Sequence, residues 1–298
     1  MELSFAEISM FPIPYFELKY LKKYKENLIF IPTKRNSDGT DKIEKIPCLF
    51  KENKNSNNIL LIFHCNGTDI FNTFHVIHKL SEEYNINIFL PEYPGYSMYQ
   101  PSIPSSEKCL DNSIIIYDYL LKNIKNITEK NIYILGRSLG TGPAVYLSSK
   151  RNPAGTILIS PFTTFAAVGK RDEEDTKILL NHFRSIDYID KINTPLLFIH
   201  GKIDPLIDYK ESLTLYEKAR KDVNKEIKIV DNMTHFFFLD DLVKDILPLI
   251  FEFVDKYCPL NKNLNKIEIN FDKNIYLSKE ELKQAIFDRT GKEEIEDN

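Results

Sequence analysis

A serine flanked by glycines is the feature of this 298-residue chain best suited to chemistry. The pentapeptide Gly136-Arg137-Ser138-Leu139-Gly140 follows an apolar, strand-like run over Asn131–Leu135, and a helical pattern starts directly after it. A strand that turns sharply into a helix strains the backbone of the central residue, and the glycines remove side chains that would clash there. We therefore expect Ser138 to stand at the carboxyl end of a strand as a nucleophile.

A serine hydroxyl needs a base and an acid that orients the base, in the chain order Ser, Asp, His for this kind of turn. Asp204 follows the strand-like run Pro195–His200, and His235 follows the run Glu226–Asp231. We predict that His235 is the general base and that Asp204 orients it. Asp208 is the alternative acid, but its place before a helical pattern suits an N-cap.

Backbone N–H groups should stabilise the negative charge that develops on the substrate oxygen. The N–H of Leu139 is one expected donor. The second should come from the loop His64-Cys65-Asn66-Gly67-Thr68, which follows the strand-like run Ile59–Phe63. We assign it to the N–H of Asn66, with Gly67 as the alternative because glycine allows close backbone approach. Cys65 is interpreted as a small packing residue rather than a redox group.

Short β-branched runs alternate with longer amphipathic stretches, which predicts an α/β fold with a mostly parallel sheet and helices on both faces. The eight candidate strands are Leu28–Thr33, Ile43–Phe50, Ile59–His64, Ile86–Pro91, Asn131–Gly136, Gly155–Ser160, Pro195–His200 and Glu226–Asp231. The candidate helices are Ile70–Tyr84, Glu107–Ile124, Leu139–Lys150, Tyr209–Lys221 and Asp240–Tyr257. Asp208 and Glu211 are spaced as a capping box at the start of the fourth helix.

Composition excludes several classes of protein. The net charge is −4, so the chain lacks the basic surface typical of nucleic-acid binders. Its four cysteines are scattered without CxxC spacing, which argues against a zinc site and favours reduced thiols in the cytoplasm. The longest apolar candidate for a membrane span, Phe236–Val254, is interrupted by charged residues. We expect no metal and no cofactor.

The chain divides into residues 1–27, a central α/β domain over 28–257, and an appendage over 258–298. Polar loops are expected at 34–42 and 51–58. In the appendage, Ser278 and Glu281 predict a capped short helix that stops at Gly291. We therefore expect one core domain, to which the two outer segments are added.

Several further motifs together carry a resemblance to a known family. They are His64-Cys65-Asn66-Gly67, Tyr93-Pro94-Gly95-Tyr96-Ser97, Gly136 to Gly142, Ser160-Pro161-Phe162, Phe183 to Asp187, His200 to Asp204, and His235. In this order the chain resembles the alpha/beta-hydrolase-domain proteins that include Bem46-like hydrolases and membrane-associated protein depalmitoylases. The resemblance covers roughly residues 28 to 257. It implies an α/β-hydrolase fold and a thioesterase that acts on an S-acylated protein. The alternative is a small-molecule carboxylesterase or a lysophospholipase.

The surroundings of Ser138 suggest how a substrate would bind. Only a short, strongly charged lid fits between Pro161 and Pro195, so we expect the serine to be open to a bulky partner. Its candidate apolar walls are Tyr93, Tyr96, Phe162 and Phe165.

Two other roles remain for the outer segments. Residues 11–25, with interleaved apolar and basic side chains, would either cover the sheet edge or touch an anionic membrane surface. The appendage over 258–298 would dock a protein partner if the fold served as a scaffold instead of an enzyme. A peptidase is the weakest alternative, because no large domain restricts access to the serine.

Overall fold

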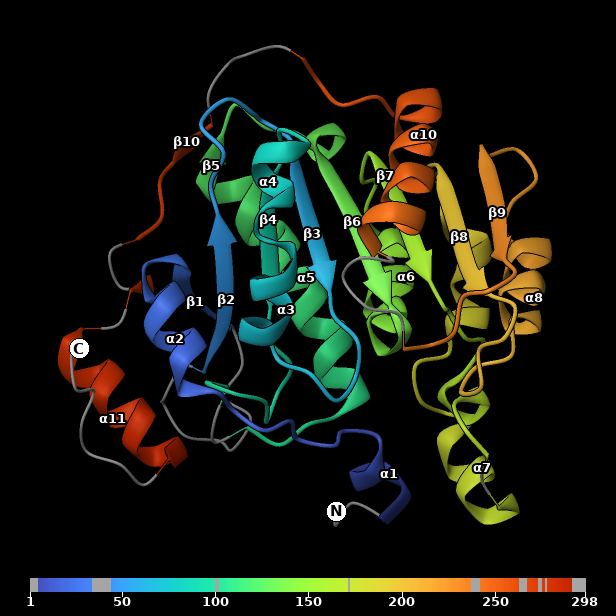
Figure 1. Cartoon of the computed structure of the whole chain (residues 1–298), viewed down its shortest axis with the longest axis horizontal. Coiled ribbons are helices and arrows are strands. Elements are labelled where there is room, and N and C mark those ends of the chain that lie inside the picture. Colours follow the sequence, from blue (N-terminus) through green and yellow to red (C-terminus); the bar gives the residue numbers. More distant parts are fainter. Residues whose placement is uncertain are drawn as a thin grey trace.

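Eight strands form one sheet in the computed structural model, which confirms the expected α/β architecture (Figure 1). The structure describes residues 5–33, 44–99, 102–170, 172–236, 242–262, 267–272, 275–276 and 278–290. The strands are β1 Leu28–Pro32, β2 Lys45–Lys51, β3 Ile59–Phe63, β4 Asn87–Pro91, β6 Ile132–Arg137, β7 Gly155–Ile159, β8 Leu196–Gly201 and β9 Lys225–Val230. All eight predicted strands are therefore present, with ends shifted by a few residues.

The order of strands across the sheet is β1-β2-β4-β3-β6-β7-β8-β9. β2 runs antiparallel to both of its neighbours, and the strands from β4 to β9 are parallel. Phe63 in β3 pairs with Gly136 in β6, and Gly201 in β8 pairs with Val230 in β9. The loops that leave these four strands therefore meet at one edge of the sheet.

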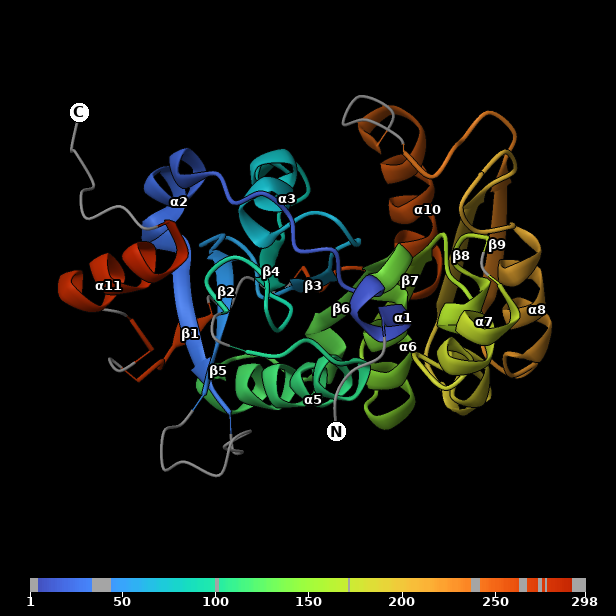
Figure 2. The same ribbon diagram turned by 90° about the horizontal axis from the view of Figure 1, so that it is seen from below.

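Helices cover both faces of the sheet because alternate side chains of each buried strand point to opposite sides (Figure 2). One face packs against α2 Leu18–Tyr24, α3 Ile70–Ile77, α4 Leu80–Glu83 and α10 Leu247–Tyr257. The other face packs against α5 Ser106–Asn123, α6 Thr141–Lys150 and α8 Lys210–Lys218. In β3, for example, Leu60 and Ile62 belong to the first core and Leu61 and Phe63 to the second.

A third apolar cluster lies beyond the carboxyl ends of the strands. Here α1 Phe5–Ser9 contacts α7 Glu173–Leu179, which lies within the short lid segment. Met10 and Phe11, which follow α1, are buried among aromatic residues of the loops. The amino-terminal segment thus packs over the edge where the predicted site lies (Figure 2).

Three helix predictions were wrong in detail. The predicted helix over 70–84 is divided into α3 and α4, and at the break His78 Nδ1 lies 3.1 and 3.0 Å from the carbonyl oxygens of Phe74 and His75. The predicted helix over 240–257 has a π-helical turn at Leu242–Ile246 before α10, which carries a proline in its first turn. Its first residues, 240–241, lie outside the described residues, as do the predicted loop at 34–42 and the stop at Gly291.

The third wrong detail is the capping box at the start of α8. The Asp208 side chain accepts a hydrogen bond from Lys210 N at 2.9 Å, so it does bind the start of the helix. Glu211, however, does not reach back to Asp208. Its carboxylate accepts from both the N–H and the hydroxyl of Thr163, at 2.9 and 2.6 Å. A long-range partner has replaced the local one.

The appendage packs on the body where it is described. The short strand β10, Glu268–Ile269, pairs with β5, Ile124–Lys125, which ends the predicted helix over 107–124 slightly early. The capping box at α11, Lys279–Thr290, is confirmed: Ser278 Oγ accepts from Glu281 N, and Glu281 Oε2 accepts from Ser278 N. Ile286 of α11 is buried in the first core. No helix within the described ranges has the length and apolar content needed to cross a membrane.

Candidate active site

The turn after β6 holds Ser138 in the strained conformation that its motif predicts. Ser138 has φ of 51° and begins a 3₁₀ turn that leads into α6. A Cβ on Gly136 would lie 2.5 Å from the carbonyl oxygen of Gly140, and one on Gly140 would lie 2.0 Å from that of Phe63. Both glycines are therefore required by close backbone contacts. The second contact also presses the turn against the loop that follows β3.

Ser138, His235 and Asp204 form a continuous chain of hydrogen bonds. His235 Nε2 lies 2.9 Å from Ser138 Oγ, and His235 Nδ1 lies 2.7 Å from Asp204 Oδ2. With the ring proton on Nδ1, the imidazole donates to the carboxylate and accepts from the serine hydroxyl. The structure thus brings together the three residues that the sequence singled out, from the ends of β6, β8 and β9.

Asp204 is held in its ionised form by several donors. Its Oδ1 accepts hydrogen bonds from the N–H groups of Leu206 and Ile207, both at 2.9 Å. Burial would raise the pKa of this carboxyl, but hydrogen bonds from His200, His235 and the backbone outweigh burial and hold the pKa well below its usual range. A carboxylate that stays charged can keep the imidazole of His235 in one tautomer.

His200 is a functional neighbour that the sequence reasoning missed. Its Nε2 lies 3.5 Å from Asp204 Oδ2 and 3.0 Å from the carbonyl oxygen of Ile207. Its Nδ1 lies 2.6 Å from Ser212 Oγ on α8. The ring is fully buried and fixes the loop that carries Asp204. The sequence feature that could have predicted this role is its position at the end of a strand, four residues before Asp204.

The loop after β3, where the second oxyanion donor was assigned, is tied to its surroundings through Asn66. The side-chain oxygen of Asn66 accepts from Tyr96 Oη at 2.6 Å, and its amide nitrogen donates to the carbonyl oxygen of Met10 at 2.7 Å. Gly67 has φ of 71°, whereas a Cβ there would meet nothing within 4 Å. Glycine is therefore favoured here for its backbone conformation, and within the described residues no protein atom crowds it. The donor roles of Leu139 and Asn66 stay predictions.

A buried carboxylate, Glu92, lies behind this loop and was also missed. Its two oxygens accept hydrogen bonds from His64 Nε2 at 3.1 Å, Ile70 N at 3.2 Å, Tyr93 N at 2.9 Å, and the Ser97 hydroxyl. These donors lie on both sides of the loop after β3 and on the loop after β4. Glu92 therefore joins the two loops beside the nucleophile. In the sequence, an acidic residue before Tyr93 gave no sign of such burial.

The four predicted substrate walls lie in the third cluster, together with Leu139. Tyr93, Tyr96, Phe162 and Phe165 are all buried, with exposed fractions of 3% or less. Burial is the main cause that raises the pKa of both tyrosines, so they stay neutral hydrogen-bond donors. Tyr93 Oη donates to the carbonyl oxygen of His64 at 2.7 Å. The aromatic rings are thus in contact with the site, but they present no open surface.

The expectation that a short lid leaves the serine open was wrong. Ser138 and His235 are only 3% and 5% exposed. The amino-terminal segment packs nearby, with Met10 and Phe11 in the same apolar cluster as Leu139. Phe11 also makes an edge-to-face contact with Phe183, with 6.1 Å between ring centroids. The length of the lid therefore does not predict how exposed Ser138 is, because segments distant in the chain also pack near it.

The chain is similar in sequence to known proteins. No family model matches the chain. It is 27% identical over 245 residues to the "Putative alpha/beta hydrolase L404" of Acanthamoeba polyphaga mimivirus, which covers 81% of this chain and 90% of that protein. It is 34% identical over 185 residues to the human "Alpha/beta hydrolase domain-containing protein 17B", which covers 62% of this chain. That match spans 63% of the human protein, which is less than two thirds of its length.

Solved structures share the fold at low sequence identity. Alpha/beta hydrolase GrgF from Penicillium has a TM-score of 0.61 at 12% identity, covering 77% of this chain and 98% of that one. The esterase Pf2001 from Pyrococcus furiosus has a TM-score of 0.61 at 15% identity, covering 84% and 98%. Est1E from Butyrivibrio proteoclasticus has a TM-score of 0.57 at 18% identity, covering 76% and 99%. These likenesses establish the fold alone.

Proposed function

We propose that this chain, which belongs to the alpha/beta-hydrolase family, is a serine hydrolase that cleaves acyl esters or thioesters through an acyl-serine intermediate. The observation that carries the proposal is the hydrogen-bonded chain from Ser138 through His235 to Asp204. Such a chain recurs on unrelated folds and is recognised by its geometry and roles.

In the first half of the reaction, Ser138 Oγ attacks the acyl carbonyl carbon while His235 Nε2 takes the hydroxyl proton. The carbonyl oxygen becomes an oxyanion that the N–H groups of Leu139 and Asn66 would stabilise. The tetrahedral intermediate then collapses, the bond to the alcohol or thiol breaks, and His235 returns the proton to that leaving group. The acyl group remains on the serine.

In the second half, water attacks the acyl-serine carbonyl and gives its proton to His235. Collapse of this intermediate releases the carboxylic acid and returns the proton to Ser138. Asp204 stays ionised throughout and stabilises the imidazolium that forms in each half. These steps use only side chains and backbone groups of this chain together with water.

Within this chemistry, we favour an S-acylated protein as the substrate and a small acyl ester as the alternative. The support is the likeness of the sequence motifs to depalmitoylases, whereas the structural neighbours include proteins named as esterases. Thioesters and oxygen esters place the same carbonyl at Ser138 and differ in the leaving group. The substrate therefore has to be distinguished by assay.

The direct test compares hydrolysis of an S-palmitoyl peptide with hydrolysis of short- and long-chain p-nitrophenyl esters. We expect turnover of the thioester, and loss of all turnover in Ser138→Ala. Turnover of the oxygen esters alone would favour the small-ester alternative. A correctly folded native protein that hydrolyses none of these compounds would favour the non-catalytic scaffold.

A further inference from the structure

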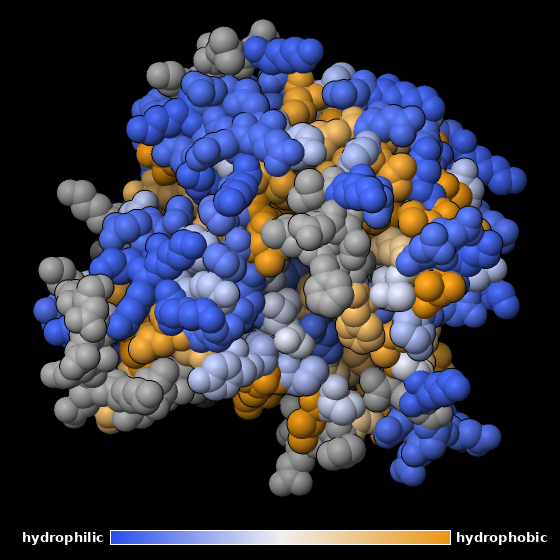
Figure 3. Space-filling view, in the orientation of Figure 1, coloured by the Kyte–Doolittle hydropathy of each residue, from blue (hydrophilic) through white to orange (hydrophobic). Residues whose placement is uncertain are grey.

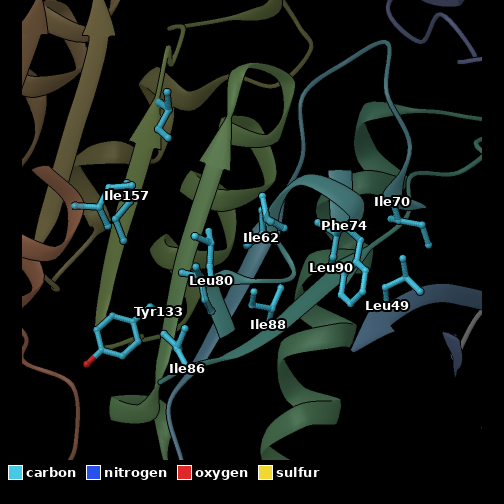
Figure 4. Packing of buried hydrophobic residues seen from close by; sticks show 14 of the residues in the cluster. Leu49, Ile62, Ile70, Phe74, Leu80, Ile86, Ile88, Leu90, Tyr133 and Ile157 are labelled. Carbon is cyan, nitrogen blue, oxygen red and sulfur yellow. The ribbon is translucent and has the colours of Figure 1, made fainter. Parts of the chain in front are cut away.

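An apolar groove runs along one face of the sheet, between α3 and α10. Its volume is about 360 Å³, within the range of roughly 300–1,000 Å³ typical of small-molecule sites. Its walls include Ile62, Leu80, Ile86, Tyr133 and Ile157, which Figure 4 shows gathered over the strands. In Figure 3, apolar side chains reach the surface in the strip between the polar outer sides of these helices.

One end of this groove lies beside the catalytic residues. Cys65 and Arg137 line it there, and they directly precede Asn66 and Ser138 in the chain. Arg137 Nη2 donates to the carbonyl oxygen of His235 at 2.9 Å, which fixes this end to the base. Away from this end, strands β3, β6 and β7 supply an apolar floor. The groove is therefore polar where an acyl carbonyl would be and apolar farther on.

The aromatic cluster, by contrast, has no room for an acyl chain in this structure. Tyr96 and Phe162 have no exposed surface, and Met10 and Phe11 pack against the same cluster. The hydrogen bond from Asn66 to the carbonyl oxygen of Met10 holds this segment next to the predicted oxyanion loop. An acyl chain could enter only by displacing the segment, whereas the groove is already formed.

We infer that the groove between α3 and α10 binds the fatty acyl chain of the substrate. The inference rests on the proposed function. The acyl carbonyl lies at Ser138, the chain passes Cys65 and Arg137, and its methylene groups lie over Ile62 and Ile157. The hydrophobic effect then favours longer chains, because each added methylene group leaves water for an apolar wall. The aromatic cluster serves as packing for the amino-terminal segment instead.

The test fills the groove and measures the kcat/KM for p-nitrophenyl dodecanoate divided by that for p-nitrophenyl acetate. Val76→Trp fills it from α3, where Val76 is partly exposed, and Leu135→Phe fills it from β6. We expect each variant to lower this ratio about tenfold, the effect of losing a few apolar contacts in a pocket. Ala166→Phe is the matched control, because it adds similar bulk beside the aromatic cluster. It should leave the ratio unchanged. A ratio that falls in Ala166→Phe but not in Val76→Trp and Leu135→Phe would overturn the inference.

A second measurement reports on the groove without turnover. Of the four cysteines, Cys65 is half-buried and the other three are buried, so N-ethylmaleimide should modify Cys65 first. In Ser138→Ala, dodecanoic acid should protect Cys65 from this modification, and Val76→Trp should remove the protection. Absence of protection in Ser138→Ala would overturn the groove assignment. Protection in a protein whose native form hydrolyses no ester would instead refute the proposed function and leave the groove standing.

Discussion

Each residue of the Ser138–His235–Asp204 chain is fixed by a further contact. Asp204 accepts from two backbone N–H groups, the carbonyl of His235 accepts from Arg137, and the turn after β6 fixes the backbone of Ser138. Groups that are already in place need little rearrangement when charge develops in the transition state. The arrangement therefore predicts large effects from small changes at Asp204.

Asp204→Asn should lower kcat for ester hydrolysis by about 10⁴-fold, because an amide would favour the wrong tautomer of His235. KM should change little, since the substrate does not contact Asp204. Asp208→Asn is the matched control, because Asp208 binds the start of α8 and, within the described residues, forms no hydrogen bond or ion pair with His235. Equal losses in the two variants would contradict the assignment of Asp204.

Asp204 should also contribute to stability in a pH-dependent way. Because its pKa is lower in the folded than in the unfolded protein, its contribution is complete above the unfolded value of about 4 and declines as the pH falls below it. The difference in free energy of unfolding between the native protein and Asp204→Asn should therefore shrink between pH 7 and pH 3. Urea unfolding at both values measures it. A difference that grows in acid would show that the folded pKa is not lowered.

The contact among these three residues could be predicted from the sequence. The buried residues that hold their loops in place, Glu92 and His200, could not. Parallel strands end at the same edge, so residues that follow β6, β8 and β9 must come close together. The burial of Glu92 and His200 depends on which loops close over them. The sequence around a single residue next to a strand does not predict that burial.

At the scale of elements, the turn after β6 depends on how closely it packs against β3. Gly140→Ala would place a methyl group 2.0 Å from the backbone oxygen of Phe63, which can be relieved only by moving the chain. We expect a loss of about 3 kcal/mol in the free energy of unfolding.

Gly67→Ala is the comparison, because its new methyl group would meet open space and only the positive φ is unfavourable. It should cost about 1 kcal/mol. Urea unfolding of both variants tests the contrast. A greater loss at Gly67 would contradict the close packing of the turn against β3.

Element types followed from the sequence because the strands are short, apolar and separated by amphipathic helices. The differences arose where a distant partner decided the outcome. Ile124 leaves its predicted helix because it pairs with Ile269 of the appendage. Glu211 leaves its predicted capping box because Thr163 offers two donors. Such partners are far away in the chain, so local patterns do not reveal them.

At the scale of the whole molecule, the amino-terminal segment packs against the body along much of its length. Phe11, Phe16, Leu21 and Tyr24 are buried, and Tyr24 Oη lies 2.7 Å from His75 Nδ1 on α3. Most apolar side chains that could enter a membrane surface are therefore already in the protein core. Of the two alternatives for residues 11–25, this burial favours packing over membrane contact.

We accordingly expect the full chain not to float with phosphatidylserine vesicles at an ionic strength of about 0.15 M, at which surface charges are strongly screened. Tyr15 is the matched site for a variant, because it lies in the same segment and is 86% exposed. Flotation that Tyr15→Ala abolishes would contradict the packing alternative and support membrane contact.

The most direct test of the central claim is covalent labelling with a fluorophosphonate probe, which reacts with an activated serine. The native protein should be labelled, and Ser138→Ala and His235→Ala should lose the label while remaining folded by circular dichroism. Labelling that persists in Ser138→Ala, or a folded native protein that takes no label, would contradict the assignment of Ser138 as the nucleophile.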